Sequence, residues 1–374
     1  MLLKKIELVN FRNYEQLSLS FAPGFNFITG DNAQGKSNLL ESIVYLSTGK
    51  SYRGAHDVHL LRWQGDFFLI RGKIESNGRD FLLEVSYSPE KGKVLKINGV
   101  EKKKGREVWG LLKTVWFSPE DLNLVKGSPE GRREFLNQLL TQVSPLYAKS
   151  LQEYNKLVGQ KNNLLKRKED GFAGEKTSLL EVYNLQLVQI GSLILKSRLD
   201  CLEKLIPLAR RFYRELSGGE ILSARYHSTV EFATSSLEEI KRGFSKGLVE
   251  KKHEEEKKGY ALVGPHRDEL EIFVNGKSLR LFGSQGQQRT CVLALKLAAM
   301  EYFQLTGGEF PVLVLDEVTS ELDESRREYL LRTIRGKSQV FVAGVDLSFL
   351  ESFPWEKGEV SFFTVEDGKV KEAR

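Results

Sequence analysis

The sequence contains few cysteines and histidines, which counts against a disulfide framework and against a metal site built from these residues. Its two cysteines, Cys201 and Cys291, lie far apart in apolar patterns with helical spacing. We expect buried thiols in a reducing compartment, because an isolated pair of this kind does not indicate a disulfide framework. The five histidines are scattered, and only His56 and His59 are close together. Without a cysteine or a further histidine beside them, we expect no metal site at this pair.

The sequence also shows no stretch that predicts membrane insertion or export. Residues 1–9 alternate like a strand and lack the apolar core of a signal peptide. No apolar run approaches the length of a transmembrane helix. With 374 residues, 40% of them hydrophobic and 28% charged, the composition is that of an ordinary globular protein of two or three domains. We therefore expect a cytoplasmic protein with no membrane partner.

A modest net charge of +6 permits nucleic acid or an anionic membrane as a partner without establishing either. Clustered Lys and Arg side chains would supply contacts to DNA phosphates, although such clusters are more often solvated faces. The candidates are Lys102, Lys103, Lys104, Arg106, Arg132, Arg133, Lys166, Arg167, Lys168, Arg210, Arg211 and Arg214. We find no helix-turn-helix, zinc finger or aromatic platform, so we expect no readout of base sequence.

Residues 30–37 match the loop that holds nucleotide phosphates, G-x-x-x-x-G-K-[ST]. The loop consists of Gly30, Asp31, Asn32, Ala33, Gln34, Gly35, Lys36 and Ser37. Phe25–Thr29 before it predicts a buried strand, and residues 38–43 after it have helical spacing. In such a loop, backbone N–H groups and a helix N-terminus face the anion, Lys36 adds positive charge, and Ser37 is expected to bind Mg²⁺. The motif predicts a nucleotide-binding site.

A second motif supplies the partner that a phosphate loop requires. Val312–Leu315 is a continuous apolar run, typical of a parallel strand buried on both faces, and Asp316 and Glu317 follow it. We expect Asp316 to hold Mg²⁺ and Glu317 to take a proton from the attacking water. Together the two motifs predict an ATPase in which Lys36 and Glu317 are the catalytic residues.

Residues 284–289, with the sequence Ser-Gln-Gly-Gln-Gln-Arg, resemble the signature motif of ABC-type ATPases in their S-x-G-Q core. They precede a helix predicted over residues 287–304. In that group the motif lies at a helix N-terminus, where a serine hydroxyl and backbone N–H groups can hold a γ-phosphate. The resemblance implies that two chains pair head to tail around two ATP molecules. Ser284 and Gln287 would then act on the nucleotide of the partner chain.

Two further segments are read against the same ATPase pattern. Residues 216–220, Leu-Ser-Gly-Gly-Glu, look closer to the transporter form of the signature but come too early relative to Asp316. We interpret their glycines as the cap of the long helix that precedes them. Ser320-Glu321-Leu322-Asp323 resembles the dimer-contact loop of these ATPases, which implies that Asp323 crosses to the partner.

The order of predicted elements indicates two lobes. Residues 1–115 read as mixed strands and helix, with a hairpin turn at Asn98-Gly99. Residues 116–259 are mainly helical, and α/β character resumes at 260. Later strands are predicted for residues 224–232, 270–274, 279–282 and 340–343, a closing hairpin around Asp367-Gly368 for 360–370, and a charged helix for 236–258. We therefore predict an α/β fold: an ABC-type P-loop ATPase head, a mixed sheet with helices, formed by 1–115 and 260–374 and interrupted by an inserted α-helical lobe at 116–259.

Boxes spread along the whole chain resemble the RecF family of bacterial recombination-mediator ATPases, which is related to the SMC chromosome proteins. The matching segments are residues 6–14, 30–41, 117–122, 127 with 132–133, 264–268 and 284–289. Several of these boxes are not shared by transporters. No role is implied for the box Gly264–Asp268: it is either functional or a turn packed by Pro265 with a pair between Arg267 and Asp268.

The resemblance implies a DNA-binding protein that dimerises on ATP and hydrolyses it slowly. Its DNA would be single-stranded, gapped or double-stranded. It would act with RecO and RecR at single-strand gaps to promote RecA loading in recombinational repair, replication restart and the SOS response. The resemblance also implies that Arg12, in the family's N-terminal motif, reaches the nucleotide phosphates.

Two departures from the wider ABC pattern favour slow hydrolysis. Gly344-Val345-Asp346 stands where transporters usually carry a switch histidine, and no equivalent of the transporter glutamine loop is evident. An ATP-binding transporter subunit is the first alternative, and these departures and the helical insert oppose it. An SMC-like structural tether is the second, but the insert lacks the sustained heptads of a long coiled coil.

Overall fold

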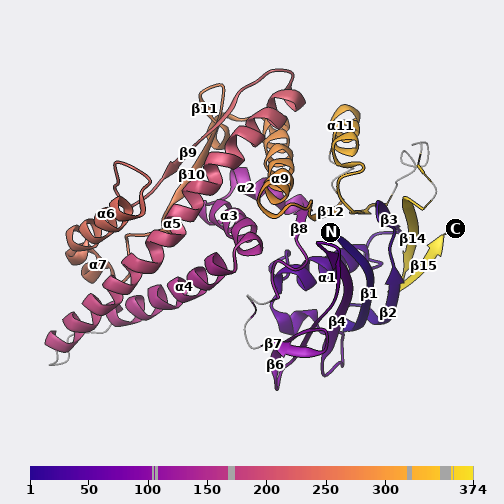
Figure 1. The fold of residues 1–374 in the computed structure, drawn as a ribbon, viewed down its shortest axis with the longest axis horizontal. Coiled ribbons are helices and arrows are strands. Elements are labelled where there is room, and N and C mark those ends of the chain that lie inside the picture. The colour runs from indigo at the N-terminus through magenta and orange to yellow at the C-terminus, as the bar shows by residue number, and fades with distance from the viewer. Residues whose placement is uncertain are drawn as a thin grey trace. The chain divides into compact units, whose positions relative to one another are not determined.

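The computed structural model divides into two compact units, residues 1–121 with 299–374 and residues 122–298 (Figure 1). It describes all residues except 103, 104, 106, 107, 167–172, 318–321, 346–354, 357 and 374. Several residues singled out from the sequence lie outside the described residues: Lys103, Lys104, Arg106, Arg167, Lys168, Ser320, Glu321 and Asp346.

An antiparallel sheet forms one layer of the first unit, with the strand order β2-β1-β4-β5-β6-β7. Its strands are β1 (Leu2–Phe11), β2 (Tyr14–Ser20), β4 (Phe68–Ser76), β5 (Arg79–Ser88), β6 (Gly92–Ile97) and β7 (Val100–Lys102). Asn98 and Gly99 join β6 to β7 with positive φ angles of 50° and 79°. Such angles at both central residues are those of the tight hairpin turn that an Asn-Gly pair favours, which confirms the predicted turn.

The second sheet of this unit carries the phosphate loop and has the order β15-β14-β3-β13-β12-β8. Its strands are β3 (Phe25–Thr29), β8 (Thr114–Phe117), β12 (Val312–Asp316), β13 (Val340–Ala343), β14 (Val360–Glu366) and β15 (Lys369–Ala373). All neighbouring pairs are parallel except β14 and β15, which form the predicted hairpin. All five residues of β12 are buried, as its continuous apolar run predicts.

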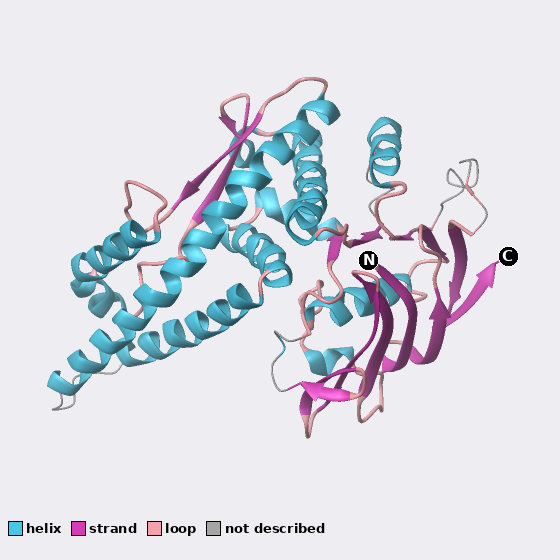
Figure 2. Cartoon of the chain, viewed as in Figure 1, coloured by secondary structure: helices cyan, strands magenta, loops and turns pink. Residues whose placement is uncertain are grey.

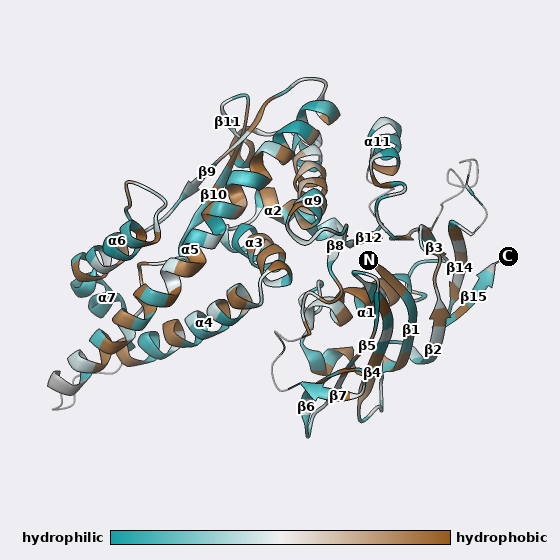
Figure 3. Cartoon of the chain, viewed as in Figure 1, coloured by the Kyte–Doolittle hydropathy of each residue, from teal (hydrophilic) through white to brown (hydrophobic). Residues whose placement is uncertain are grey.

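Helix α1 (Lys36–Thr48) packs against strands of both sheets and joins them into one core. Ten of its residues are buried, so it is apolar on more than one face, as expected of a helix enclosed between two layers. Figure 3 shows hydrophobic colour along α1 and β1. The short helix η1 (Asp57–Leu60) and α11 (Glu324–Ile334) complete the named elements of this unit.

The second unit is mainly helical (Figure 2). The long helix α5 (Ala173–Ser217) packs against α4, α6 and β9. The remaining elements are α2 (Asn123–Lys126), α3 (Pro129–Val143), α4 (Pro145–Lys166), β9 (Leu222–His227), α6 (Leu237–Glu250), α7 (Lys252–Lys258), β10 (Glu269–Val274), β11 (Lys277–Ser278), α8 (Leu279–Phe282) and the first part of α9 (Gln285–Gly307). A short helix, η3 (Pro119–Leu122), lies at the junction with the first unit.

The structure differs from the predicted elements at four places. The strand predicted over residues 224–232 is β9, which runs over Leu222–His227. Residues 260–298 group with the helical unit and not with the head, because β10 pairs with β9 and the Arg132 guanidinium holds the Glu269 carboxylate at 2.7 Å. Residues 279–282 form helix α8 and not a strand, since the β10–β11 hairpin ends after Ser278. The helix predicted over 236–258 is broken at Lys251 into α6 and α7.

One helix in the described part of the chain is long and apolar enough to cross a membrane, over Lys176–Ser217, which the sequence analysis overlooked. This segment is most of α5. It buries Leu187, Ile194 and Leu205 together with the charged residue Arg198, which donates hydrogen bonds to Tyr147 and Tyr226. These buried contacts are those of a core helix in a folded unit.

Candidate functional site

The loop between β3 and α1 has the backbone shape that its glycines predict. Gly30 and Gly35 have φ angles of 142° and 122°, in a region that side chains other than glycine rarely adopt. A Cβ atom on Gly30 would lie only 2.3 Å from the Val365 carbonyl oxygen, and one on Gly35 would lie 2.5 Å from the Asn13 side chain. Gly30 is therefore required by close backbone approach as well as by conformation, and Gly35 by its conformation, with the Asn13 side chain lying against it.

Two distant turns fasten the loop. From the β1–β2 turn, Asn13 donates to the Gln34 carbonyl at 2.8 Å, and the Tyr14 hydroxyl donates to the Gly35 carbonyl at 3.0 Å. From the β14–β15 turn, the Asp367 N–H donates to the Gln34 side chain at 2.6 Å. The sequence analysis missed these contacts, because no motif links the turns to the loop.

Lys36 lies inside the loop, with only 4% of the residue exposed. Its ammonium donates to the carbonyl oxygens of Gly30 and Asp31, each at 2.7 Å. The exposed residues Asp31, Asn32 and Ala33 form the outer side of the loop. A positive charge held at the start of a helix by a curled backbone fits the binding of a phosphate group.

The structure brings the two ATPase motifs together at Asp316. The Ser37 hydroxyl donates to one oxygen of this carboxylate at 2.9 Å, and the Tyr52 hydroxyl donates to the other at 2.6 Å. Burial raises the pKa of Asp316, whereas the two hydrogen bonds act in the opposite direction. Tyr52, which the sequence analysis missed, follows α1 and carries no motif that could have identified it.

The donor set around Asp316 fits Mg²⁺. The ion prefers oxygen ligands, and at nucleotide sites it is held by one or two protein oxygens together with substrate phosphates and water. Ser37 and Asp316 are the residues that would hold it. No cluster of three or more His, Cys, Asp or Glu side chains that could hold a metal is found in the described part of the chain.

Glu317 follows Asp316 and has an unusual backbone conformation. Its φ angle is 57°, in the left-handed region, and its N–H donates to the Ala343 carbonyl of β13 at 3.1 Å. A residue other than glycine in this region is strained, and such strain is common at functional sites. The conformation agrees with a special role for Glu317, whose function as the catalytic base stays a prediction.

Arg12 is engaged with α1 in this structure. Its guanidinium makes two hydrogen bonds to the fully buried Glu41 carboxylate, at 2.8 and 2.9 Å, and a third to the His59 carbonyl at 3.0 Å. A paired, fork-shaped contact of this kind fixes both side chains. The contact of Arg12 with nucleotide phosphates stays a prediction, and the structure shows a second role in anchoring η1 and α1 to the first strand.

The signature residues lie at the start of α9. The Ser284 hydroxyl accepts a hydrogen bond from the Gln287 N–H at 3.2 Å, and the Gln287 side chain accepts one from the Ser284 N–H at 3.0 Å. This reciprocal pair is a helix capping box. Gln287 also donates to Glu220 at 2.7 Å. Ser284 is exposed, as contact with a second chain would require.

Glu220 belongs to the segment 216–220, which was interpreted as a helix cap. Helix α5 ends at Ser217, and Gly218 has a φ angle of 71°. The Gly219 N–H donates to the Arg214 carbonyl at 2.9 Å, which is the closing bond of a glycine-capped helix end. The capping interpretation is therefore confirmed, and the segment additionally supports the signature through Glu220.

Asp323 caps helix α11. Its carboxylate accepts hydrogen bonds from the Arg326 N–H at 2.9 Å and from the Ser325 hydroxyl at 2.8 Å. These contacts hold the pKa of Asp323 below its usual value. The crossing of Asp323 to a partner chain stays a prediction, while its local role as a helix cap is a finding of the structure.

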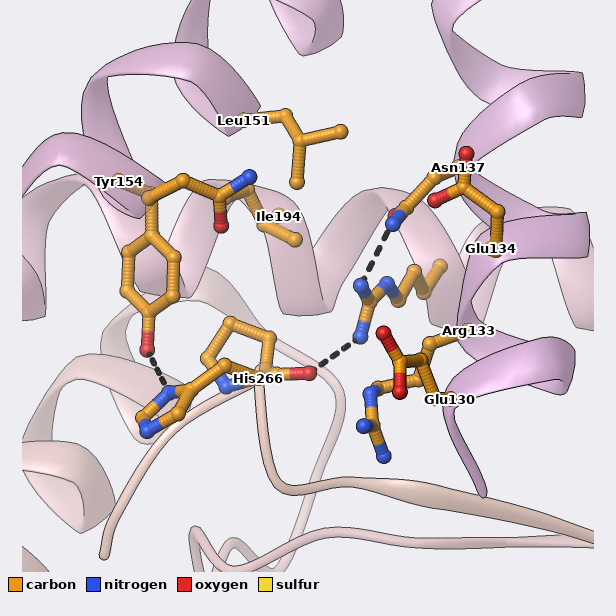
Figure 4. A pocket seen from close by; sticks show the side chains of 11 residues that line it. Glu130, Arg133, Glu134, Asn137, Leu151, Tyr154, Ile194 and His266 are labelled. Carbon is orange, nitrogen blue, oxygen red and sulfur yellow. Dashed lines mark hydrogen bonds between the residues drawn. The ribbon is translucent and has the colours of Figure 1, made fainter. Parts of the chain in front are cut away.

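The box Gly264–Asp268 borders a small polar pocket in the second unit, with a volume of about 160 Å³ (Figure 4). The Tyr154 hydroxyl lies 2.8 Å from Nδ1 of His266, and the Arg198 guanidinium donates to the Pro265 carbonyl at 2.7 Å. The turn is confirmed by the hydrogen bond from Arg267 N–H to the Gly264 carbonyl at 2.9 Å.

The expected pair between Arg267 and Asp268 is not what the structure shows. Arg267 donates to the Ala261 carbonyl at 3.0 Å and lies over the Tyr260 ring. Asp268 is buried and accepts from the Tyr226 hydroxyl of β9 at 2.8 Å, and from the Ser228 hydroxyl and the Thr229 N–H of the loop after β9, each at 3.1 Å. A buried carboxylate needs several donors, and β9 supplies them better than a neighbouring exposed arginine.

Among the candidate DNA contacts, Arg132 is not available. It is 3% exposed, and its side chain donates twice to Glu269 at 2.7 Å. Arg133, beside it, donates to the Asp268 carbonyl at 2.8 Å. The prediction that this pair could bind DNA is wrong for Arg132. By contrast, Arg210, Arg211 and Arg214 have exposed side chains near the end of α5.

Comparisons of sequence identify the relatives of this chain. The model of the RecF/RecN/SMC N-terminal domain family matches residues 2–369. The DNA replication and repair protein RecF of Bacillus cereus (strain AH820) is 43% identical over 353 residues, which cover 94% of each chain. The protein of the same name in Bacillus thuringiensis (strain Al Hakam) shows the same identity and coverage.

Comparisons of structure agree. A solved structure of the recombination mediator protein RecF-ATP in the RecFOR pathway superposes with a TM-score of 0.91 at 35% identity, covering 100% of this chain and 97% of that one. An Smc head domain from Pyrococcus furiosus, with a TM-score of 0.53 at 17% identity over 99% and 95% of the two chains, shares the fold alone. The predicted ABC-type ATPase fold is confirmed. This chain belongs to the RecF family of DNA replication and repair proteins.

Proposed function

We propose that this protein is an ATP-dependent DNA-binding protein of recombinational repair and replication restart. ATP would bind at the phosphate loop and bring two chains together head to tail. The observation that carries the proposal is the hydrogen bond from Ser37 to Asp316, which joins two nucleotide motifs 279 residues apart. The similarity to a RecF-ATP structure supports ATP as the ligand.

Each chain would contribute different parts to a composite site. Lys36 and the loop N–H groups bind the phosphates, and Ser37 and Asp316 would hold Mg²⁺, which would supply positive charge beside the phosphates. Glu317 takes the proton of the attacking water. Ser284 and Gln287 of the partner chain would close the site at the γ-phosphate. The absence of a switch histidine from the sequence pattern supports slow hydrolysis, so ATP would act as a timer for the dimer.

The DNA contacts of the dimer would be made to the backbone. Arg210, Arg211 and Arg214 form an exposed cluster that would supply phosphate contacts, and the contribution of these contacts should weaken as salt rises. We propose that the dimer acts in the cytoplasm at single-strand gaps with RecO and RecR, and thereby promotes RecA loading and the SOS response. A similar solved structure is that of the recombination mediator protein RecF in the RecFOR pathway, and this similarity supports the assignment.

Sedimentation with and without ATP tests the proposal directly. The wild type should form dimers with ATP and bind gapped or linear DNA in that state, whereas Lys36→Ala should remain monomeric. A wild type that stays monomeric and indifferent to DNA in the presence of ATP would overturn the proposed function.

The role of Glu317 has its own test. Glu317→Gln should bind ATP, stall before hydrolysis and accumulate as a dimer, because only the proton acceptor is removed. The measurement is the decay of the dimer after ATP is diluted. Faster decay than in the wild type would contradict the assignment of Glu317 as the base.

A further inference from the structure

The turn after α1 brings a tyrosine to the carboxylate expected to hold Mg²⁺. Tyr52 donates to Oδ2 of Asp316 at 2.6 Å, while Ser37 donates to Oδ1 at 2.9 Å. Each carboxylate oxygen therefore has one protein donor. Asp316 is 5% exposed, and the charges of Glu317 and Arg53 lie close enough to act on it.

Tyr52 is half-buried and packs against the hydrophobic core of the first unit. The centroid of its ring lies 6.4 Å from the centroid of the Trp116 ring, on strand β8 beside β12. Its backbone belongs to a turn in which the Gly54 N–H donates to the Ser51 carbonyl at 3.2 Å. The Ser51 hydroxyl in turn donates to the buried Glu41 carboxylate on α1. These contacts connect the turn that carries Tyr52 to helix α1.

Two donors on opposite oxygens fix the rotation of a carboxylate, whereas a single donor leaves it free to turn. An ionised carboxylate has about four acceptor positions, so Asp316 keeps positions open for the water around a metal. Hydrogen bonds from residues that do not themselves contact the metal orient the carboxylates that bind it. We propose that Tyr52 is a positioning residue that sets the Asp316 carboxylate for Mg²⁺. This inference rests on the proposed function of the site as an ATP site.

The variant Tyr52→Phe tests the inference, because it removes the hydroxyl and keeps the ring against Trp116. The full chain is titrated with Mg²⁺ in the presence of a fluorescent ATP analogue. The half-saturating Mg²⁺ concentration should rise about tenfold or more. Affinity for the nucleotide in EDTA should stay at the wild-type value. The melting temperature should fall, because one oxygen of the buried Asp316 carboxylate loses its donor, but the unfolding transition should stay cooperative.

A matched control is available in the same unit. The Tyr45 hydroxyl donates to the Asp57 carboxylate at 2.8 Å, away from Asp316. Tyr45→Phe should therefore leave the Mg²⁺ titration unchanged. The inference is overturned if Tyr52→Phe and Tyr45→Phe show the same half-saturating Mg²⁺, or if Tyr52→Phe loses affinity in EDTA as well. A wild type that binds no analogue at all would instead overturn the proposed function.

Discussion

At the scale of single residues, His266 is held in the neutral form by its surroundings. Burial lowers its pKa from 6.5 to about 4, and the nearby charges of Arg267, Lys161 and Arg133 act in the same direction. Its ring faces the Tyr154 hydroxyl at Nδ1. The folded state therefore resists protonation of this histidine, whereas the unfolded chain accepts a proton near its ordinary pKa.

Stability should consequently fall as the medium is acidified from pH 7 to pH 5. The unfolded state takes up a proton on His266 in this range, while the folded state does so only near pH 4. The expected loss in the free energy of unfolding is about 1 to 2 kcal/mol. Urea denaturation followed by circular dichroism at the two pH values measures it.

The variant His266→Asn isolates this contribution. Asp268, whose pKa is raised by burial, contributes with the opposite sign, since its stabilising proton is lost as the pH rises. That contribution is present in both proteins. The pH dependence between 7 and 5 should be smaller in the variant, and an equal dependence would show that His266 is not the responsible group.

At the scale of elements, Asp323 has two possible roles that one substitution series separates. As the cap of α11, it satisfies the Arg326 N–H. Asp323→Ala should lower the free energy of unfolding by about 1 kcal/mol, while Asp323→Asn should retain most of that stability because asparagine is a comparable cap. Denaturation in urea without ATP measures both variants.

The dimer readout then addresses the second role of Asp323. Asp323→Asn removes the charge and keeps the cap, so a loss of ATP-dependent dimer in this variant would assign the charge to the partner contact. Equal destabilisation by alanine and asparagine would show that the capping geometry does not account for the contribution of Asp323 to stability.

Helices and strands of this chain differ in how far their local sequence determines their secondary structure. The strand Phe25–Thr29 and the buried strand before Asp316 were predicted because local pattern and tertiary surroundings agree. Residues 279–282 have an alternating pattern that suits a strand, yet they form α8. The reason is tertiary: Leu279 is buried beneath a helical turn, and its carbonyl accepts from the Gln288 side chain of α9.

The same distinction applies to the site. The phosphate loop, Asp316 and the capping role of the glycines after α5 follow from short motifs with a local physical reason. Tyr52, Asn13 and Glu220 do not, because each acts on a partner far away in sequence and belongs to a residue type with many ordinary uses. Such contacts become visible only when the fold has brought the segments together.

At the scale of the whole molecule, the composite site predicts complementation between two defective chains. Lys36→Ala damages the loop and leaves the signature intact, whereas Ser284→Arg should spare ATP binding and block the closing of a partner's site. In a mixed dimer, the loop of the Ser284→Arg chain faces the signature of the Lys36→Ala chain, which makes one intact site. The mixture should therefore recover ATP-dependent dimer and hydrolysis that neither variant shows alone.

Sedimentation and phosphate release from the separate and mixed variants measure this recovery. A double variant, Lys36→Ala with Ser284→Arg, mixed with either single variant is the matched control, since no pairing then yields an intact site. Failure of the first mixture to exceed this control would show that the signature does not act on the partner chain. Loss of ATP binding in Ser284→Arg itself would show that the signature was misplaced.

The position of β3 in its sheet has a consequence for the making of the protein. This strand lies between β13 and β14, and the loop that follows it is tied to Asp367. When residues 30–37 leave the ribosome, none of these neighbours has been translated, whereas the segment 122–298 is complete much earlier than they are. Since units tend to fold as they emerge, the helical unit can form on the nascent chain first. A partly translated chain would therefore be unable to bind nucleotide, and the site would form only after residue 367 has been translated.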